Sequence, residues 1–107
     1  MDMQTSPLAL LKDPSLLKTD ALINGEWVKG SHRFDVLDPS NGRKLADVAN
    51  LGPDDASRAI AAADAAWPAW RNKTAKERSI VLRKWYDLLM ANVEDLGRIL
   101  TAEQGKP

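Results

Sequence analysis

The sequence has 107 residues, of which 44% are hydrophobic and 28% are charged, a composition typical of a globular protein and not of a disordered one. Lys and Arg together number 15, as do Asp and Glu, so the net charge is zero and we expect neither a nucleic-acid partner nor a membrane partner. Cysteine is absent, which excludes disulfides, thiolate metal sites and a thiol nucleophile within these residues.

Residues 1–20 are interpreted as a weakly structured lead-in, with one helical turn expected at 15–17, after Pro14. Their apolar run, 8–11, is too short for the core of a signal peptide, and the lead-in has no arginine to suggest a transit peptide. No stretch of the chain approaches the ~20 apolar residues of a membrane span. We therefore expect a soluble, cytoplasmic protein.

Residues 21–49 have the pattern of short antiparallel strands. Asn24-Gly25 separates two apolar runs and predicts a hairpin with a type I′ turn, because both central residues of that turn need a positive φ. Two alternating segments, RFDVL at 33–37 and KLADVA at 44–49, flank the turn sequence DPSNG. The first half of the chain is therefore predicted to be a small antiparallel β-meander.

A first helix is predicted to begin at Pro53, with Asp54 and Asp55 in its positively polarised first turn. Pro68 is expected to end this helix near Trp67, because the residue before a proline avoids the α region. Trp70 would then pack from a tight linker.

A second helix is predicted to open with a capping box formed by Thr74 and Glu77. Asn92 is expected to cap a third helix, and Gly105 is suited to the position just after its end. The apolar face of the second helix consists of Val81, Leu82, Trp85, Leu88 and Leu89. The second half of the chain is thus predicted to contain two or three α-helices.

Few residues are candidates for chemistry. His32 is the only histidine and has no neighbouring metal ligand, so we interpret it as a solvated turn residue. Asp54 and Asp55 are interpreted as first-turn acids, because adjacent helical residues do not face one another. Glu103 follows the apolar face of the third helix and is expected to be partly buried. It is either a general base with a raised pKa or, as we prefer, a hydrogen-bond partner of the backbone at Gly105.

Other site patterns are missing from the sequence. The six glycines are scattered through turns, and none forms a dinucleotide-binding G-x-G-x-x-G or a Walker loop.

Three tryptophans, Trp67, Trp70 and Trp85, give the helical half a large apolar surface. We prefer the interpretation that they pack on one another; the alternative is that this surface is covered by a partner or by further polypeptide.

Four stretches occur in a particular order: ALINGEWV, the run from DPSNG to WPAW, TAKERSIVLRKWYDLLMAN and LTAEQGKP. Together they resemble the beginning of the NAD(P)-dependent aldehyde dehydrogenases, most closely the bacterial succinate-semialdehyde dehydrogenases. The resemblance covers residues 22–107. It is most specific in the succession of WPAW at 67–70, the capping segment at 74–78 and EQGKP at 103–107.

The resemblance implies an α/β enzyme in which residues 21–107 are the N-terminal, incomplete part of the cofactor-binding domain. The family uses a cysteine nucleophile, a glutamate general base, an oxyanion-binding asparagine and a Rossmann-type cofactor site, all of which would lie beyond Pro107. No position of this sequence matches those motifs. We therefore assign no catalytic, cofactor-binding or metal-binding residue to the chain, and expect the 107-residue segment alone to be structural and inactive.

The implied reaction is the oxidation of an aldehyde, succinate semialdehyde to succinate, with NADP or NAD. The implied partners are the remainder of the same polypeptide, the small aldehyde substrate and further copies in a dimer or tetramer. The residues that select the nicotinamide cofactor and the substrate are not among those present. The alternative function is a self-contained helical binding module that docks a protein partner on its tryptophan-rich face.

Overall fold

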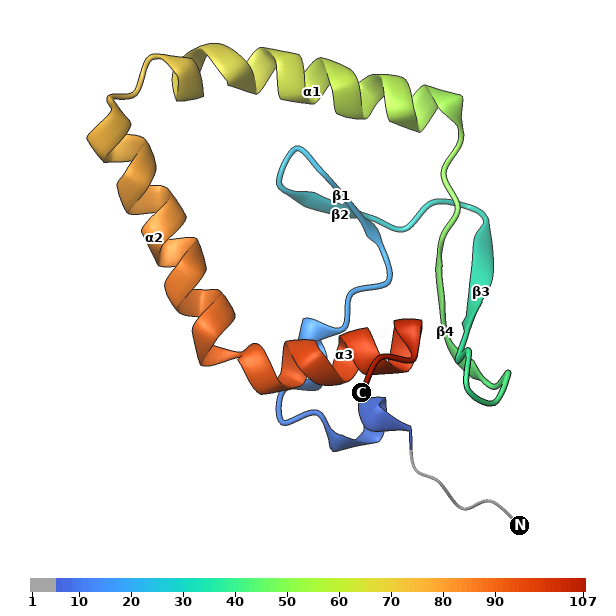
Figure 1. Ribbon diagram of the computed structural model, residues 1–107. Helices are drawn as coiled ribbons and strands as arrows, with labels where there is room; N and C mark the ends of the chain where they lie inside the picture. Colours follow the sequence, from blue (N-terminus) through green and yellow to red (C-terminus); the bar gives the residue numbers. More distant parts are fainter. Residues whose placement is uncertain (1–5) are drawn as a thin grey trace.

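Two short 3-10 helices open the described part of the chain, which comprises residues 6–107 of the computed structural model (Figure 1). They are η1 (Pro7–Leu10) and η2 (Pro14–Leu16), and each begins with a proline that follows a capping side chain. The helical turn predicted after Pro14 is confirmed, whereas η1 was not predicted. Residues 1–5 of the predicted lead-in lie outside the described residues.

The first hairpin pairs β1 (Ala21–Ile23) with β2 (Glu26–Val28) in antiparallel register. Its turn residues, Asn24 and Gly25, have φ values of 51° and 75°. These are the left-handed conformations of a type I′ turn, which glycine adopts freely and asparagine adopts more easily than most residues. The predicted hairpin is confirmed.

The second hairpin pairs β3 (Arg33–Leu37) with β4 (Lys44–Ala49), and Phe34 lies opposite Val48. The predicted antiparallel pairing is thus confirmed, but the strands form two separate two-stranded sheets in place of one continuous meander. The outer edge of β4 explains this division, because the Ala49 N–H donates to the carbonyl of Thr19 in the lead-in. That edge is therefore engaged by the chain entering β1, and not by β2.

Helix α1 (Pro53–Arg71) is longer than predicted. The prediction that it ends near Trp67 is wrong, because the helix continues through Pro68 and includes Trp70. Proline removes one helical hydrogen bond, but the next turn closes normally: the Asn72 N–H donates to the Pro68 carbonyl at 3.0 Å. The alanine-rich sequence before Pro68 favours helix strongly enough to compensate for the missing bond.

Helix α2 (Ala75–Ala91) begins with the predicted capping box. The Glu77 N–H donates to Thr74 Oγ1 at 3.1 Å, and the Thr74 N–H donates to Glu77 Oε1 at 3.0 Å. The bond from the Thr74 N–H favours the ionised carboxylate and is the main reason that the pKa of Glu77 lies below its ordinary value.

Helix α3 (Val93–Gln104) ends at Gly105, whose φ of 79° is the predicted left-handed termination. Asn92 occupies the N-cap position of α3, as predicted, but its side chain makes no capping hydrogen bond to that helix. Its Nδ2 group instead donates to the Leu88 carbonyl at 2.9 Å, so it satisfies the C-terminal end of α2. Helix α3 also packs against η1.

The three helices form three sides of an open frame, and the β1–β2 hairpin lies inside it next to α1 (Figure 1). The radius of gyration is 17.3 Å, against about 13 Å for a compact domain of this length. Within residues 6–107, Ala102 is the one buried hydrophobic residue. The described residues therefore form no substantial hydrophobic core. In the same range, no helix combines the length and apolar character needed to cross a membrane.

The tryptophans of the helical half do not bury one another. Trp67 is 50% exposed and Trp85 is 61% exposed, while Trp70 is half-buried. The preferred expectation of mutual packing is therefore wrong. The alternative, an apolar surface that other protein would cover, remains a hypothesis.

Candidate functional site

The positions of His32, Asp54 and Asp55 agree with the structural roles expected for them. His32 is exposed in the turn before β3. Asp54 and Asp55 occupy the first turn of α1, and Asp55 forms an ion pair with Arg58 one turn later. Across residues 6–107, no cluster of three or more His, Cys, Asp or Glu side chains is placed to hold a metal ion.

Glu103, the candidate general base, is exposed at the end of α3, so its expected partial burial is wrong. It borders a cavity of about 30 Å³, roughly the volume of one water molecule, beside Leu8 and Val36. The expected hydrogen bond with the turn is also replaced, since the Gly105 N–H donates to the Thr101 carbonyl at 2.8 Å. The segment lacks the packed core that would bury this face of α3.

The glycines do not form a nucleotide-binding loop in the described part of the chain. Gly25, Gly30, Gly42 and Gly105 each have a positive φ and each belongs to a different turn or helix end. A dinucleotide site needs several glycines together at a strand-to-helix turn, so that the backbone can approach the pyrophosphate. The residues present therefore do not fit a nicotinamide dinucleotide.

Arg33 is the centre of a charged network that joins the lead-in to the second hairpin. Its Nε donates to Asp47 Oδ1 at 2.6 Å, and its Nη1 donates to Asp20 Oδ1 at 3.0 Å. Three further bonds go to the carbonyls of Lys29, Thr19 and Asp47. Because a guanidinium has five N–H groups, all of its donors are used, and none is available for an anionic substrate.

This network also fixes the charge states of its members. The hydrogen bonds from Arg33 hold the pKa of Asp47 below its ordinary value. The same contact with Asp47, followed by that with Asp20, raises the pKa of Arg33. Asp47 therefore stays ionised and is unsuited to proton transfer near neutral pH.

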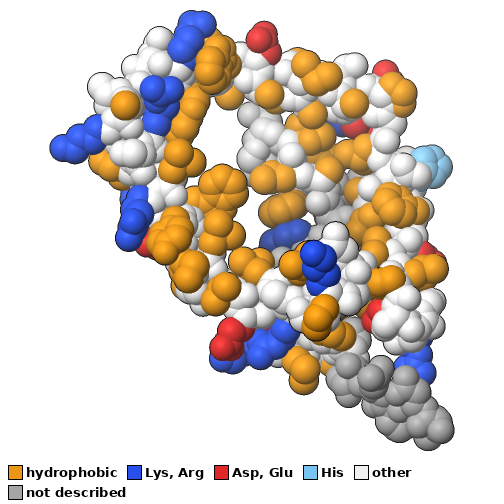
Figure 2. Space-filling view, viewed as in Figure 1, with side chains coloured by type: hydrophobic (Ala, Val, Ile, Leu, Met, Phe, Trp, Pro, Cys, Tyr) orange, Lys and Arg blue, Asp and Glu red, His pale blue; other side chains and the backbone are white. Residues whose placement is uncertain are grey.

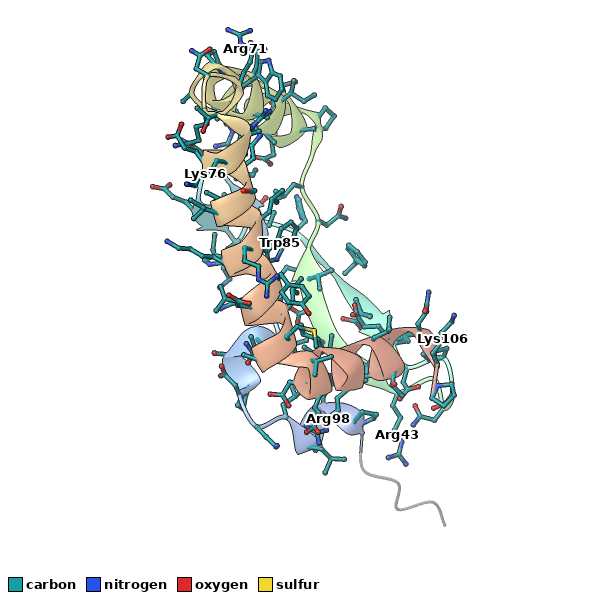
Figure 3. All side chains as sticks on the ribbon, turned by 60° about the vertical axis from the view of Figure 1, so that its left-hand side comes forward. Arg43, Arg71, Lys76, Trp85, Arg98 and Lys106 are labelled. Carbon is teal, nitrogen blue, oxygen red and sulfur yellow. The ribbon has the colours of Figure 1, made fainter. Side chains whose placement is uncertain are left out.

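Asp95 is a buried carboxylate that fastens the lead-in to α3, and it is only 5% exposed. Its two oxygens accept hydrogen bonds from the backbone N–H groups of Lys12, at 3.0 Å, and Asp13, at 2.9 Å. Arg98, labelled in Figure 3, adds a bond from Nη1 at 2.8 Å. The two backbone donors are the main reason that the pKa of Asp95 is lowered. A general base needs the opposite shift, so this carboxylate has a structural role.

Neither Arg33 nor Asp95 was singled out from the sequence. The partners of Asp95 lie 82 and 83 residues away along the chain, and no local motif connects them. Taken together, the ionisable groups of residues 6–107 connect segments of the chain and do not converge on a reactive centre.

Comparison with known proteins gives a consistent family assignment. Residues 27–107 match the aldehyde dehydrogenase family. The chain is 50% identical over 99 residues to a 3-sulfolactaldehyde dehydrogenase of Pseudomonas putida, and 48% identical over 99 residues to the succinate-semialdehyde dehydrogenase GabD of Escherichia coli K12, whose name specifies NADP(+). Both alignments cover 91% of this chain and 20% of the relative.

Solved structures show the same relationship. A succinate-semialdehyde dehydrogenase from Burkholderia pseudomallei superimposes with a TM-score of 0.87 at 52% identity, and an aldehyde dehydrogenase from Brucella melitensis biovar abortus 2308 superimposes with 0.88 at 44% identity. Each match covers 91% of this chain and 20% of the solved chain. The chain thus spans about a fifth of the length of its relatives and corresponds to their N-terminal part. It belongs to the aldehyde dehydrogenase family.

Proposed function

We propose that this chain is the N-terminal portion of an NAD(P)-dependent enzyme that oxidises succinate semialdehyde to succinate. The observation that carries the proposal is the match, at about half identity over 91% of the chain, to aldehyde dehydrogenases of which it spans a fifth. The named substrates of three relatives are 3-sulfolactaldehyde, succinate semialdehyde and glutarate semialdehyde. These are all short aldehydes that carry an anionic group.

Within such an enzyme, residues 1–20 are a lead-in, and residues 21–107 are an incomplete N-terminal part of the cofactor-binding domain. The catalytic and cofactor-binding residues lie outside this segment, and NADP or NAD binds there. Three observations support this division: the chain has no cysteine, Glu103 is exposed, and Arg33 has no free donor. The segment alone is therefore structural and inactive.

The whole enzyme is proposed to be a cytoplasmic dimer or tetramer that binds neither nucleic acid nor membrane. The balance of 15 basic and 15 acidic residues supports the last part for this segment. The alternative function, a self-contained module that docks a partner protein, would need a core of its own. With Ala102 as the one buried hydrophobic residue of the described range, we do not prefer it.

The test is a steady-state assay of the longer polypeptide that begins with this sequence. Succinate semialdehyde, glutarate semialdehyde and butanal are compared, each with NAD and with NADP. We expect kcat/KM for at least one carboxylated aldehyde to exceed that for butanal by about 100-fold, because a site built to bind a charged group rejects a substrate lacking it. Equal rates with butanal would contradict the substrate assignment, and no nicotinamide reduction with any aldehyde would contradict the proposed function.

A further inference from the structure

The sequence contains two Asn-Gly pairs, Asn24-Gly25 and Asn41-Gly42, and each lies in the turn of one of the two hairpins. Both asparagines and both glycines are exposed. The two glycines have similar left-handed backbones, with φ values of 75° and 73°. Beyond the adjacent residues, neither glycine has an atom within 4 Å of the position that a Cβ would take. The two pairs are therefore matched in sequence and in access to solvent.

An asparagine followed by glycine is prone to spontaneous deamidation, because glycine has no Cβ to shield its backbone nitrogen. This nitrogen gives up its proton to water or hydroxide and attacks the asparagine Cγ. The side-chain amide leaves as ammonia, and a five-membered succinimide ring forms. Water then opens the ring: cleavage of the Cγ–N bond gives aspartate, and cleavage of the backbone C–N bond gives isoaspartate. The net reaction consumes one water molecule and releases one ammonia molecule.

Hydrogen bonds restrain the second pair against this reaction. The Gly42 N–H, which carries the attacking nitrogen, donates to the Asp38 carbonyl at 2.7 Å. Asn41 Oδ1 accepts from the Arg43 N–H at 2.9 Å, so the orientation of the side chain is fixed as well. The Asp38 N–H donates to the Arg43 carbonyl at 2.8 Å and closes the turn. Ring closure at Asn41 therefore requires that several hydrogen bonds break together.

The first pair lacks these restraints. Among residues 6–107, neither the Asn24 side chain nor the Gly25 N–H has a hydrogen-bond partner. Strands β1 and β2 have three residues each and pair only with one another, and a two-stranded sheet of this size opens readily. This opening is needed, because the succinimide ring cannot form in the left-handed conformation of Asn24. The second hairpin has longer strands and is fastened by the Arg33 network, so it opens less often.

The position of the first turn determines what its modification changes. Figure 2 shows the tip of the β1–β2 hairpin beside the open space of the frame. The turn lines a groove of about 330 Å³ together with four small residues of α1: Ala59, Ala62, Ala63 and Ala66. Aspartate at position 24 preserves the turn, because Asp-Gly favours type I′ as Asn-Gly does. Isoaspartate adds one methylene to the main chain, so the two-residue turn that sets the register of the hairpin is lost.

We propose that Asn24 is a site of spontaneous deamidation, that it reacts faster than Asn41, and that isoaspartate formed there loosens the β1–β2 hairpin. The substrate is the protein's own turn, and water is the co-reactant. The inference does not rest on the proposed function, because both pairs and the hydrogen bonds that distinguish them lie within residues 6–107. Aldehyde oxidation is not a readout of the test, so failure of one proposal leaves the other intact.

The test follows both pairs by peptide mass mapping while the longer polypeptide that begins with this sequence is stored at mildly alkaline pH. The same protein unfolded in guanidinium chloride gives the intrinsic rates, which should be similar at the two positions. In the native protein, we expect deamidation at Asn24 to be about tenfold faster than at Asn41, because reaction depends on local opening. Equal rates at the two positions in the native protein, or a faster reaction at Asn41, would overturn the proposal.

Product analysis and a matched pair of variants test the mechanism and its consequence. A mixture of aspartate and isoaspartate at position 24 supports the ring, whereas aspartate alone would indicate direct hydrolysis and overturn it. In Asn24→Gln the amide lies one methylene too far for a five-membered ring, so storage should not alter that turn; Asn41→Gln should leave Asn24 as reactive as before. Amide exchange in residues 21–28 should be faster in the stored protein than in the fresh one, and unchanged in stored Asn24→Gln. Unchanged exchange after isoaspartate has formed would overturn the loosening of the hairpin.

Discussion

Asp95 shows how a single buried carboxylate organises the N-terminal part of this chain. Its two oxygens each accept one backbone N–H, from Lys12 and from Asp13, and Arg98 adds a charged donor. Together these bonds favour the ionised form, in which both oxygens accept fully. The attachment of the lead-in to α3 therefore depends on the chemistry of one side chain.

Asp95→Asn should release the lead-in from α3. Asparagine keeps one acceptor oxygen but replaces the other with an NH₂ group, which would face a backbone N–H. We expect hydrogen exchange at the amides of Lys12 and Asp13 to accelerate by about tenfold or more. Glu94→Gln is the matched control, because the Glu94 side chain is 68% exposed and makes only ion pairs, with Lys12 at 3.3 Å and with Arg98 at 3.9 Å, whose loss should change these rates little. Unchanged exchange in the Asp95 variant would show that apolar contacts alone hold the lead-in.

The same contact should depend on pH in a defined direction. The pKa of Asp95 is lower in the folded chain than in the unfolded chain. A group of this kind contributes stability above its unfolded pKa, and the contribution is lost as the pH falls through the folded pKa. Protection of the Lys12 and Asp13 amides, corrected for intrinsic exchange, should be constant near neutral pH and disappear only in the acidic range below an ordinary aspartate pKa. The Asp95 carboxylate is ionised throughout the range from about pH 6 to about pH 8. Loss of amide protection within that range would therefore contradict this interpretation.

At the residue scale, sequence reasoning succeeded where the physical cause is local. Asn24-Gly25, the Thr74–Glu77 capping box and Gly105 all depend on conformational preferences and on partners within a few residues. The roles of Arg33 and Asp95 depend on partners that the fold brings together, so no local sequence pattern predicts them. The prediction that Glu103 is partly buried was wrong for a related reason, because a residue on an apolar helix face is buried only when another layer of protein covers that face.

The C-terminal end of α1 is hard to predict from the sequence pattern because the helix contains Pro68. Proline at an interior position leaves the carbonyl four residues earlier, that of Asp64, without its helical donor. The rule that a proline ends a helix was outweighed here by the alanine-rich sequence before it and by the capped turn after it. The helix therefore carries a weak point directly between Trp67 and Trp70.

Pro68→Ala should stabilise α1. The substitution restores one helical hydrogen bond and removes the clash of the ring with the preceding turn, an effect of up to about 3 kcal/mol in a helix interior. We expect slower amide exchange at Trp70 and Arg71 and higher helical content by circular dichroism. Pro53→Ala is the control, because proline at the first helical position interrupts no hydrogen bond and its replacement should change little. A loss of helicity in the Pro68 variant would contradict this interpretation.

At the element scale, the order and type of the predicted strands and helices are confirmed, and the differences concern how they associate. The strands form two hairpins because the lead-in engages the edge of β4 at Ala49. The Asn92 side chain completes α2 in place of α3. Both outcomes depend on which backbone groups the folded chain brings close together. A local sequence pattern does not reveal such contacts.

The whole molecule is an open frame whose apolar side chains are largely uncovered. We expect the isolated 107-residue chain to bind a hydrophobic dye and to unfold with little cooperativity, because Ala102 is the one buried hydrophobic residue of the described range. Small-angle scattering should give a radius of gyration well above the about 13 Å of a compact domain. A sharp unfolding transition without dye binding, at the compact size, would instead support the self-contained binding module.

We propose that this segment contributes structure and that the catalytic residues lie elsewhere in a longer enzyme. The most direct test compares nicotinamide reduction, with succinate semialdehyde as substrate, by the purified 107-residue chain and by the longer polypeptide at equal molar concentration. We expect turnover by the longer polypeptide and none above background by the 107-residue chain with either NAD or NADP. Turnover by the 107-residue chain itself would contradict this proposal, because the chain has no cysteine to supply the nucleophile that the resemblance implies.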